Sequence, residues 1–156
     1  MQPRIENFPK IAAEAYRGML AVEAYVQGSG VPKSTLNLVK IRASQINGCA
    51  FCLDMHNHEA KKAGEADERL FTVAAWRESP FFTPEERAAL ALTEASTRIT
   101  DNSAGVPDEV WDEVADTYDE QSLAALVVAI AQINAWNRIS VTIRSVAGSH
   151  RHATTT

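Results

Sequence analysis

The sequence predicts an all-α fold built as one helical domain. Nearly every segment carries apolar residues at helical spacing, whereas period-two runs of β-branched residues are missing and no Asn-Gly turn separates two such runs. The length of 156 residues suits a single domain, and a hydrophobic content of 46% supplies a sizeable core. We therefore expect one helical domain over residues 1–148 and a flexible C-terminal tail over residues 149–156.

Helix start and stop signals divide the chain into a series of helices. Pro9 suits the first turn of the first helix, which the Gly- and Pro-containing run at residues 28–32 ends. Ser34 is the expected N-cap of the next helix, and Gly48 ends it. The predicted helices cover residues 8–26, 35–46, 49–63, 67–76, 83–99, 107–118 and 120–146.

The later helices carry equally clear signals. Gly64 follows the helix that begins at Cys49, and Asp67 is the expected cap of the next one. Thr83, Pro84 and Glu86 form the pattern of a capping box with proline at the first helical position. The last helix is apolar nearly all round, so we expect it at the buried centre of the bundle.

Charge and hydropathy exclude several classes of protein. Fifteen Lys and Arg against twenty Asp and Glu give a net charge of -5, which disfavours a non-specific nucleic-acid binder and a polybasic membrane-surface protein. The N-terminus lacks the apolar stretch of a secretory signal, and the longest uncharged run, residues 121–137, is too short and too polar for a membrane helix. We expect a cytoplasmic protein, and in a reducing compartment Cys-x-x-Cys indicates redox chemistry or metal binding rather than a structural staple.

The segment with the clearest chemistry contains Cys49, Cys52 and His56. A helix turns about 100° per residue, so with Cys49 at zero, Cys52 lies near about 300° and His56 near about 340°, on one face. Both cysteines fall in the first turn, where unpaired N–H groups and the positive helix end stabilise a thiolate. His56 can exchange a proton with Cys52, and the second thiol can close a disulfide. His58 projects from the opposite face, where we expect solvent.

Two plainer interpretations stay open. The cysteines could be ordinary buried thiols, which are common in protein cores. They could also bind zinc with His56, but no second cysteine pair exists, and Cys49 and His56 lie about 10 Å apart along the helix axis.

The stretch from Leu38 to His56, with its Cys-x-x-Cys-x-x-x-His core, resembles the core motif of the alkylhydroperoxidase AhpD-like family within the carboxymuconolactone decarboxylase superfamily. The resemblance continues at residues 69–70, 75–77, 86–94 and 133–138, and it covers about residues 10 to 146. It implies an AhpD-like helical bundle that assembles as a homo-oligomer, often a trimer or hexamer. It also implies thiol-dependent peroxidase or disulfide-reductase activity without flavin, haem or metal, with a dithiol reductant that in AhpD is a lipoylated protein.

Carried over residue by residue, the resemblance makes Cys52 the peroxide-reactive thiol, Cys49 the resolving thiol and His56 part of a proton relay. The dipole argument alone favours Cys49 as the thiolate, whereas the nearness of His56 favours Cys52. We follow Cys52.

The chain departs from the AhpD pattern at two positions. The relay glutamate twelve residues before the first cysteine is replaced by Asn37, which cannot take a proton, and a histidine between the cysteines is replaced by Phe51. Glu59, on the same face as the cysteines, and Glu94 are candidate replacement acids. We expect weaker peroxidase activity than the full relay gives, and Asn37→Glu should raise the rate of thiol oxidation.

The predicted function is thus reduction of hydrogen peroxide or an alkyl hydroperoxide, or of a disulfide, through Cys49 and Cys52 assisted by His56. A non-enzymatic redox-responsive oligomer is the alternative, and a carboxymuconolactone decarboxylase-type enzyme ranks below it, because the paired thiols would then have no role. Trp76, Arg77, Trp136 and Arg138 are expected in packing or ion pairs rather than in substrate contacts.

Overall fold

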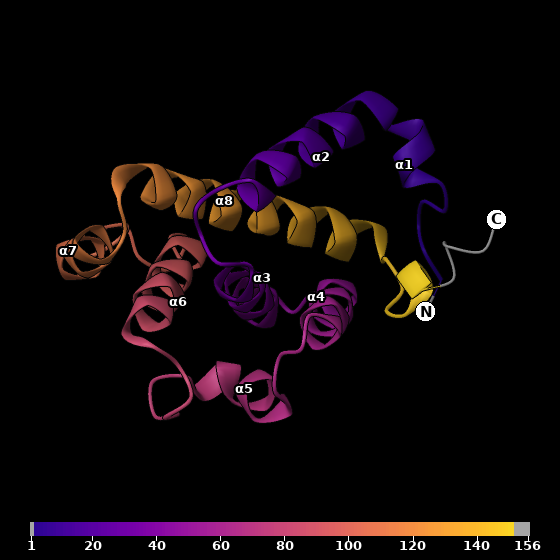
Figure 1. The fold of residues 1–156 in the computed structure, drawn as a ribbon. Helices are drawn as coiled ribbons and strands as arrows, with labels where there is room; N and C mark the ends of the chain where they lie inside the picture. The colour runs from indigo at the N-terminus through magenta and orange to yellow at the C-terminus, as the bar shows by residue number, and fades with distance from the viewer. Residues whose placement is uncertain (1, 152–156) are drawn as a thin grey trace.

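The computed structural model describes residues 2–151 as an all-α bundle, with no β-strand in that range. Its long helix α8 crosses the bundle, with α2 on one side and α3 and α6 on the other (Figure 1). The helices are α1 (Phe8–Ile11), α2 (Ala13–Gln27), α3 (Lys33–Asn47), α4 (Ala50–Lys62), α5 (Asp67–Thr72), α6 (Pro84–Thr97), α7 (Asp108–Thr117) and α8 (Glu120–Ile143), with 3-10 turns at Val73–Ala75 and Ser149–Arg151.

The hydrophobic core has two parts that share α3 and α6. One cluster joins these helices to α7 and α8 around residues such as Leu36, Leu92 and Leu126. The other joins them to α4, α5 and the following 3-10 turn around Ile41, Leu90 and Trp76. Helix α3 therefore lies in the middle of the bundle, and its C-terminal end is held from several sides.

Helix α8 is buried along one face but is not the buried centre that the sequence predicts, because Val127 and Val141 on its other face are 43% and 48% exposed. Leu123, Leu126, Ala129 and Ile133 are buried against the rest of the bundle. By length and composition alone α8 could also cross a membrane, but it packs against α2, α3 and α6, as the core helix of a globular domain does.

Several predicted helix boundaries are wrong in detail. The first helix is divided at Ala12, whose backbone leaves the helical region at φ −105° and ψ 40°. Pro32, not Ser34, is the N-cap of α3, because the Leu36 amide already closes the first turn on the Pro32 carbonyl. Ala66, not Asp67, precedes α5, and this helix ends at Thr72 instead of continuing to Trp76 as an α-helix.

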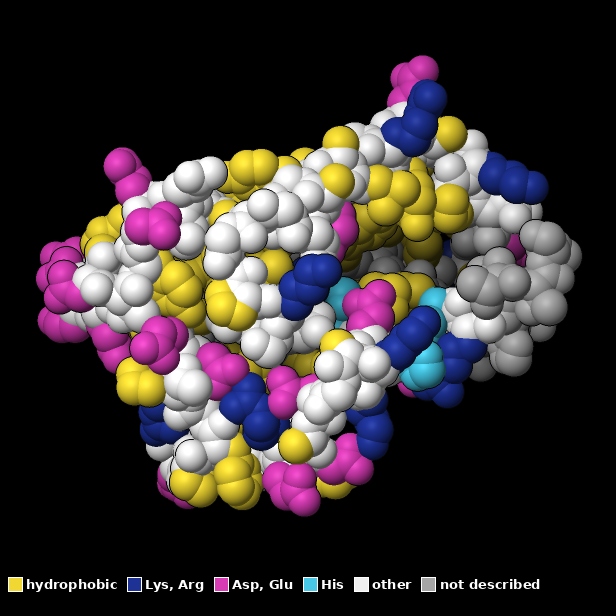
Figure 2. Space-filling view, viewed as in Figure 1, with side chains coloured by type: hydrophobic (Ala, Val, Ile, Leu, Met, Phe, Trp, Pro, Cys, Tyr) yellow, Lys and Arg dark blue, Asp and Glu magenta, His cyan; other side chains and the backbone are white. Residues whose placement is uncertain are grey.

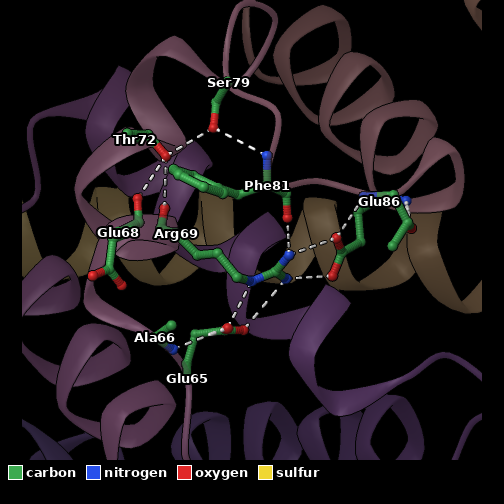
Figure 3. A network of polar contacts seen from close by, with 9 residues as sticks. Glu65, Ala66, Glu68, Arg69, Thr72, Ser79, Phe81 and Glu86 are labelled. Atoms are coloured by element: carbon green, nitrogen blue, oxygen red, sulfur yellow. Dashed lines mark hydrogen bonds and ion pairs between the residues drawn. The ribbon is translucent and has the colours of Figure 1, made fainter.

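The capping box at the start of α6 is confirmed, and it also anchors a neighbouring segment. The Thr83 hydroxyl accepts a hydrogen bond from the Glu86 amide, and the Glu86 carboxylate accepts one from the Thr83 amide. The same carboxylate pairs with Arg69 of α5, which also pairs with Glu65 and donates to the Phe81 carbonyl (Figure 3). The hydrogen bond to Glu86, ahead of that to Glu65, raises the pKa of Arg69.

The segment after α8 folds back onto α4. The Gly148 amide donates to Asp54 over 2.8 Å, and Arg151 forms an ion pair with the same carboxylate. Ser149–Arg151, which we expected in the flexible tail, forms a 3-10 turn, and residues 152–156 lie outside the described part of the chain.

Candidate functional site

The two cysteines stand at the corner between α3 and α4. Gly48 ends α3 with a left-handed backbone, φ 66° and ψ 30°, and this turns the chain into α4. Cys49 is the N-cap of α4, and its sulfur accepts a hydrogen bond from the Cys52 amide at 3.3 Å. The predicted placement of the Cys-x-x-Cys segment at a helix N-terminus is therefore confirmed.

A chain of buried amides fixes this corner to α8. Asn47 donates to the side-chain oxygens of Asn134 and Asn137, each over 2.9 Å. Asn137, which is fully buried, donates in turn to the Ser44 hydroxyl over 3.0 Å. Asn134 continues the network to Thr97 of α6. Because buried amides are costly when unpaired, this network specifies how the last turn of α3 sits on α8.

Cys49 and Cys52 are joined by a disulfide, with a Cα–Cα distance of 5.4 Å. Each cysteine is only 1% exposed. The structure therefore shows the oxidised state of the pair, and it brings together the two sulfurs that the sequence placed on one helix face.

His56 lies one turn beyond Cys52, buried on α4, and its ring is oriented by Glu59. The Nδ1 atom of His56 and Oε2 of Glu59 are 3.0 Å apart. The hydrogen bond from His56, which outweighs partial burial, holds the pKa of Glu59 below its ordinary value. Within residues 2–151, no hydrogen bond joins the His56 ring to either sulfur in this oxidised state.

A cavity of about 620 Å³ opens beside His56, and we call it the α2/α4 cavity. Its walls come from the N-terminal segment, α1, α2, α3, α4, α8 and the segment that follows α8. Figure 2 shows a hollow beneath α2 with a mainly hydrophobic interior and histidine and acidic side chains at its rim. Phe51, His56 and Glu59 belong to its lining, whereas neither cysteine does.

The cavity also contains a buried ion pair that the sequence analysis did not identify. Lys40 of α3 is almost fully buried and pairs with Glu23 of α2. Both residues line the cavity, and the Lys40 charge also lowers the pKa of Glu59. The available signal was a lysine on a buried helix face, which requires a partner, but nothing in the sequence identified Glu23 as that partner.

Glu94, the other candidate acid, lies in a different place. It is bound by Arg42, Trp76 Nε1 and the exposed Arg77, and these residues line a separate cleft of about 330 Å³. Burial raises the pKa of Glu94, but the hydrogen bonds from Arg77, Trp76 and Arg42 outweigh it and hold that pKa below its ordinary value. No hydrogen bond or ion pair links Glu94 to His56 within residues 2–151, so Glu59 is the acid beside the imidazole.

Other residues from the sequence analysis have clear positions. His58 is exposed, and its ring packs near that of His150. Trp136 is half-buried, stacks edge-on against Tyr16 and lines the α2/α4 cavity, so it has a surface toward any ligand as well as a packing role. No cluster of three or more His, Cys, Asp or Glu side chains suited to a metal occurs in the described part of the chain.

Comparisons with known proteins agree with this architecture. The profile of the carboxymuconolactone decarboxylase family matches residues 12–95. The chain is 44% identical over 149 residues to the protein YdfG of Bacillus subtilis, and the aligned part covers 96% of this chain and 99% of YdfG. A segment of 42 residues, 27% of this chain and 24% of the relative, is 43% identical to the alkyl hydroperoxide reductase AhpD of Nocardia farcinica.

A solved structure shows the same fold. The Agrobacterium tumefaciens protein ATU0492, described as a candidate AhpD antioxidant defence protein, superposes with a TM-score of 0.87 at 39% identity. The match covers 94% of this chain and 98% of that one. On the strength of the family profile, these relatives and the shared fold around the Cys-x-x-Cys corner, the chain belongs to the carboxymuconolactone decarboxylase family as an AhpD-like member.

Proposed function

We propose that the protein is a thiol-dependent peroxidase or disulfide reductase that works through Cys49 and Cys52 with the assistance of His56. The observation that carries the proposal is the disulfide between these cysteines at the start of α4, inside an AhpD-like fold. The helix N-terminus stabilises a thiolate once the disulfide is reduced, and the thiolate is the nucleophilic form of cysteine.

The chemical steps balance with a hydroperoxide and a dithiol. The Cys52 thiolate attacks the terminal peroxide oxygen, the O–O bond breaks, and the leaving alkoxide takes a proton to become an alcohol. Cys52 is then a sulfenic acid, which the Cys49 thiol attacks with loss of water to give the disulfide. A partner dithiol returns two electrons and two protons and is itself oxidised to a disulfide.

His56 and Glu59 supply the proton transfer in this proposal. Since Nδ1 of His56 bonds Glu59, the Nε2 atom is the one left to exchange a proton with a thiol or a leaving alkoxide. Glu59 takes the role of the relay glutamate that Asn37 replaces in this chain. Its carboxylate orients the His56 ring and stabilises the imidazolium. The His56 ring must approach Cys52 in the reduced state, because the oxidised state shows no hydrogen bond between them within residues 2–151.

Three further features of the proposal rest on the family resemblance. The reductant is a small dithiol or a dithiol carried by a protein, such as a lipoylated one. The chain acts as a homo-oligomer, a trimer or hexamer, and it acts in the cytoplasm. Sedimentation analysis of the purified protein tests the assembly directly.

Peroxide consumption in the presence of a dithiol tests the activity. We expect turnover by the wild-type protein, no turnover by Cys52→Ser, and a single oxidation without disulfide closure in Cys49→Ser. Stoichiometric oxidation of the wild type without turnover would contradict the peroxidase and favour the redox-responsive alternative. The pKa of each thiol, measured by thiolate absorbance of the single variants, checks that Cys52 is activated.

A matched pair of variants tests the acid. Glu59→Gln should slow thiol oxidation by about 10²-fold, which is the lower end of the usual contribution of proton transfer. Glu113→Gln on the exposed face of α7 removes the same charge and should leave the rate unchanged. Asn37→Glu in the Glu59→Gln background should restore part of the rate. Equal rates for all these variants would remove Glu59 from the mechanism.

A further inference from the structure

We propose that the α2/α4 cavity binds an uncharged aromatic organic molecule, so that the substrate class is an uncharged aromatic hydroperoxide rather than hydrogen peroxide or an anionic hydroperoxide. The chemical part rests on the proposed function, whereas the binding part does not. The size of the cavity, its walls, its charges and its position beside His56 support this assignment.

The cavity is far larger than hydrogen peroxide requires. Its volume of about 620 Å³ lies in the range of sites for drug-sized organic molecules. A small oxidant gains almost no binding free energy from such a space, whereas a molecule with an apolar body removes the wall from water.

The walls favour a ring system. Tyr16 and Trp136 meet edge to face with their ring centroids 5.3 Å apart, and Phe8 and Phe51 contribute further aromatic surface. Aliphatic side chains from α2 and α8, including Leu20 and Ile133, complete the apolar interior. Aromatic side chains give ring-shaped ligands specific offset and edge contacts in addition to area burial.

The charges disfavour an anion. Glu6, Glu23 and Glu59 line the cavity, and Lys40, which lines it as well, is already paired with Glu23. His56 is hydrogen-bonded to Glu59 and therefore does not offer an unopposed positive charge. A carboxylate or sulfonate would therefore enter a site in which Glu6, Glu23 and Glu59 outnumber Lys40, and the repulsion between like charges weakens its binding.

The position of His56 connects the cavity to the thiols. His56 and Phe51 lie on α4 within one turn of Cys52, and both line the cavity. In the proposed orientation, a ring bound among Tyr16, Trp136 and Leu20 directs its oxygen-bearing end toward His56 on α4. The leaving alkoxide then forms next to the proton-exchanging group.

Binding is measured by titration calorimetry on the oxidised protein, which needs no turnover. The probes are 2-naphthalenemethanol, which is uncharged, and 2-naphthoate, which has the same ring and a negative charge. We expect saturable binding of the alcohol and at least about tenfold weaker binding of the anion. Absence of saturable binding of 2-naphthalenemethanol, or equal affinity for the two probes, overturns the inference.

Variants locate the bound probe. Leu20→Trp places bulk in the cavity from a side chain that is 47% exposed, so the fold tolerates it, and it should weaken binding at least about tenfold. Val141→Trp is the matched control, since Val141 is 48% exposed on α8 and lies outside the lining. If both variants lose affinity for the probe equally, or if neither loses affinity, the probe binds elsewhere and the assignment is overturned.

Charge variants test the selectivity. Glu23→Gln leaves the buried Lys40 unpaired and should bring the affinity for 2-naphthoate up to that for the alcohol. Glu6→Gln removes one exposed charge at the rim and leaves no buried partner unpaired, so it serves as the second variant if Glu23→Gln does not fold. It should reduce the difference in affinity between 2-naphthalenemethanol and 2-naphthoate. An unchanged preference in the variant that folds contradicts the electrostatic argument.

Turnover separates this inference from the proposed function. Cumene hydroperoxide should oxidise the reduced protein at a higher kcat/KM than hydrogen peroxide. Leu20→Trp should lower the kcat/KM for cumene hydroperoxide more than that for hydrogen peroxide. If 2-naphthalenemethanol binds but neither cumene hydroperoxide nor hydrogen peroxide oxidises the thiols, the proposed peroxidase function is refuted and the proposed binding site remains. Turnover that shows no preference for cumene hydroperoxide refutes the substrate class.

Discussion

Replacing Glu94 by glutamine should destabilise the fold more than any surface charge change. The Glu94 carboxylate is only 7% exposed, and it accepts hydrogen bonds from Arg42 Nε at 2.7 Å and Trp76 Nε1 at 3.0 Å, besides its pairing with Arg77. Glutamine keeps the shape and one acceptor oxygen but removes the charge. The Arg42 guanidinium, which is 11% exposed, then loses its counter-charge.

The size of the effect follows from which arginines are buried. Removing one partner of a buried ion pair costs about 3–5 kcal/mol. Arg77 and Arg98 are 59% and 44% exposed, so water stabilises them without Glu94, and Arg42 dominates the loss. We therefore expect a loss of about 3 kcal/mol in the free energy of unfolding at pH 7, the lower end of that range. For a chain of this length, such a loss corresponds to a fall in Tm of about 6–12 °C.

The pH dependence gives a second, independent readout. The pKa of Glu94 in the folded protein lies below its ordinary value of 4.5, so its contribution is present above about pH 4.5 and is lost as the pH falls through the folded-state pKa. The difference between wild type and Glu94→Gln should shrink correspondingly in acid.

Urea unfolding followed by circular dichroism from pH 3.5 to 7 measures both quantities. Arg98→Ala is the control, because its ion pair to Glu94 is 3.5 Å long and exposed and should contribute less than about 1 kcal/mol. A penalty below about 1 kcal/mol for Glu94→Gln, or one that does not change with pH, would refute the reasoning.

Three further predictions concern other parts of the molecule. Gly48→Ala should cost about 1–2 kcal/mol in urea unfolding because of the left-handed backbone at φ 66°, whereas Gly18→Ala inside α2 should be neutral or stabilising; equal effects would contradict the strain argument. Asn137→Ala should cost about 1–3 kcal/mol and raise amide exchange at the α3–α4 corner, and unchanged exchange there would show that the amide network does not position it. Burial, followed by the charges of Glu85 and Glu86, raises the pKa of Tyr118 to about 12. Its phenolate absorbance, assigned by comparison with Tyr118→Phe, should therefore appear only near pH 12, and the contribution of this group to the free energy of unfolding should fall between about pH 10 and 12. Phenolate absorbance of Tyr118 near pH 10 would contradict this prediction.

Local chemistry explains why so much of the fold is predictable from the sequence. The capping box at Thr83 and Glu86, the stop at Gly48 and the apolar circumference of α8 each depend on residues within a few positions of one another. The confirmed placement of Cys49 at a helix start has the same origin. Boundaries failed where local signals compete: Ser34 is a good cap, but the Pro32 carbonyl closes the first turn earlier.

The long-range partners could not be predicted in the same way. Glu23 and Glu94 are paired with Lys40 and Arg42 only by the packing of α2 and α6 on α3. Glu59 differs, because its position on the helix face that carries the cysteines made it a candidate acid from the sequence, and the structure pairs it with His56. The roles of Cys49, Cys52 and His56 stay predictions until the thiols are assayed.

Described residues near both termini, from residues 3–9 and 145–150, form one wall of the α2/α4 cavity. The Arg4 amide donates to the Ile143 carbonyl, and the segment around Gly148 is tied to α4 through Asp54. Chain ends separate from a fold at lower free energy than its core. A ligand can therefore enter when the hydrogen bonds of Arg4 and Gly148 open, while the thiol corner stays fixed to α8. Hydrogen exchange at residues 4 and 148 should then report its entry.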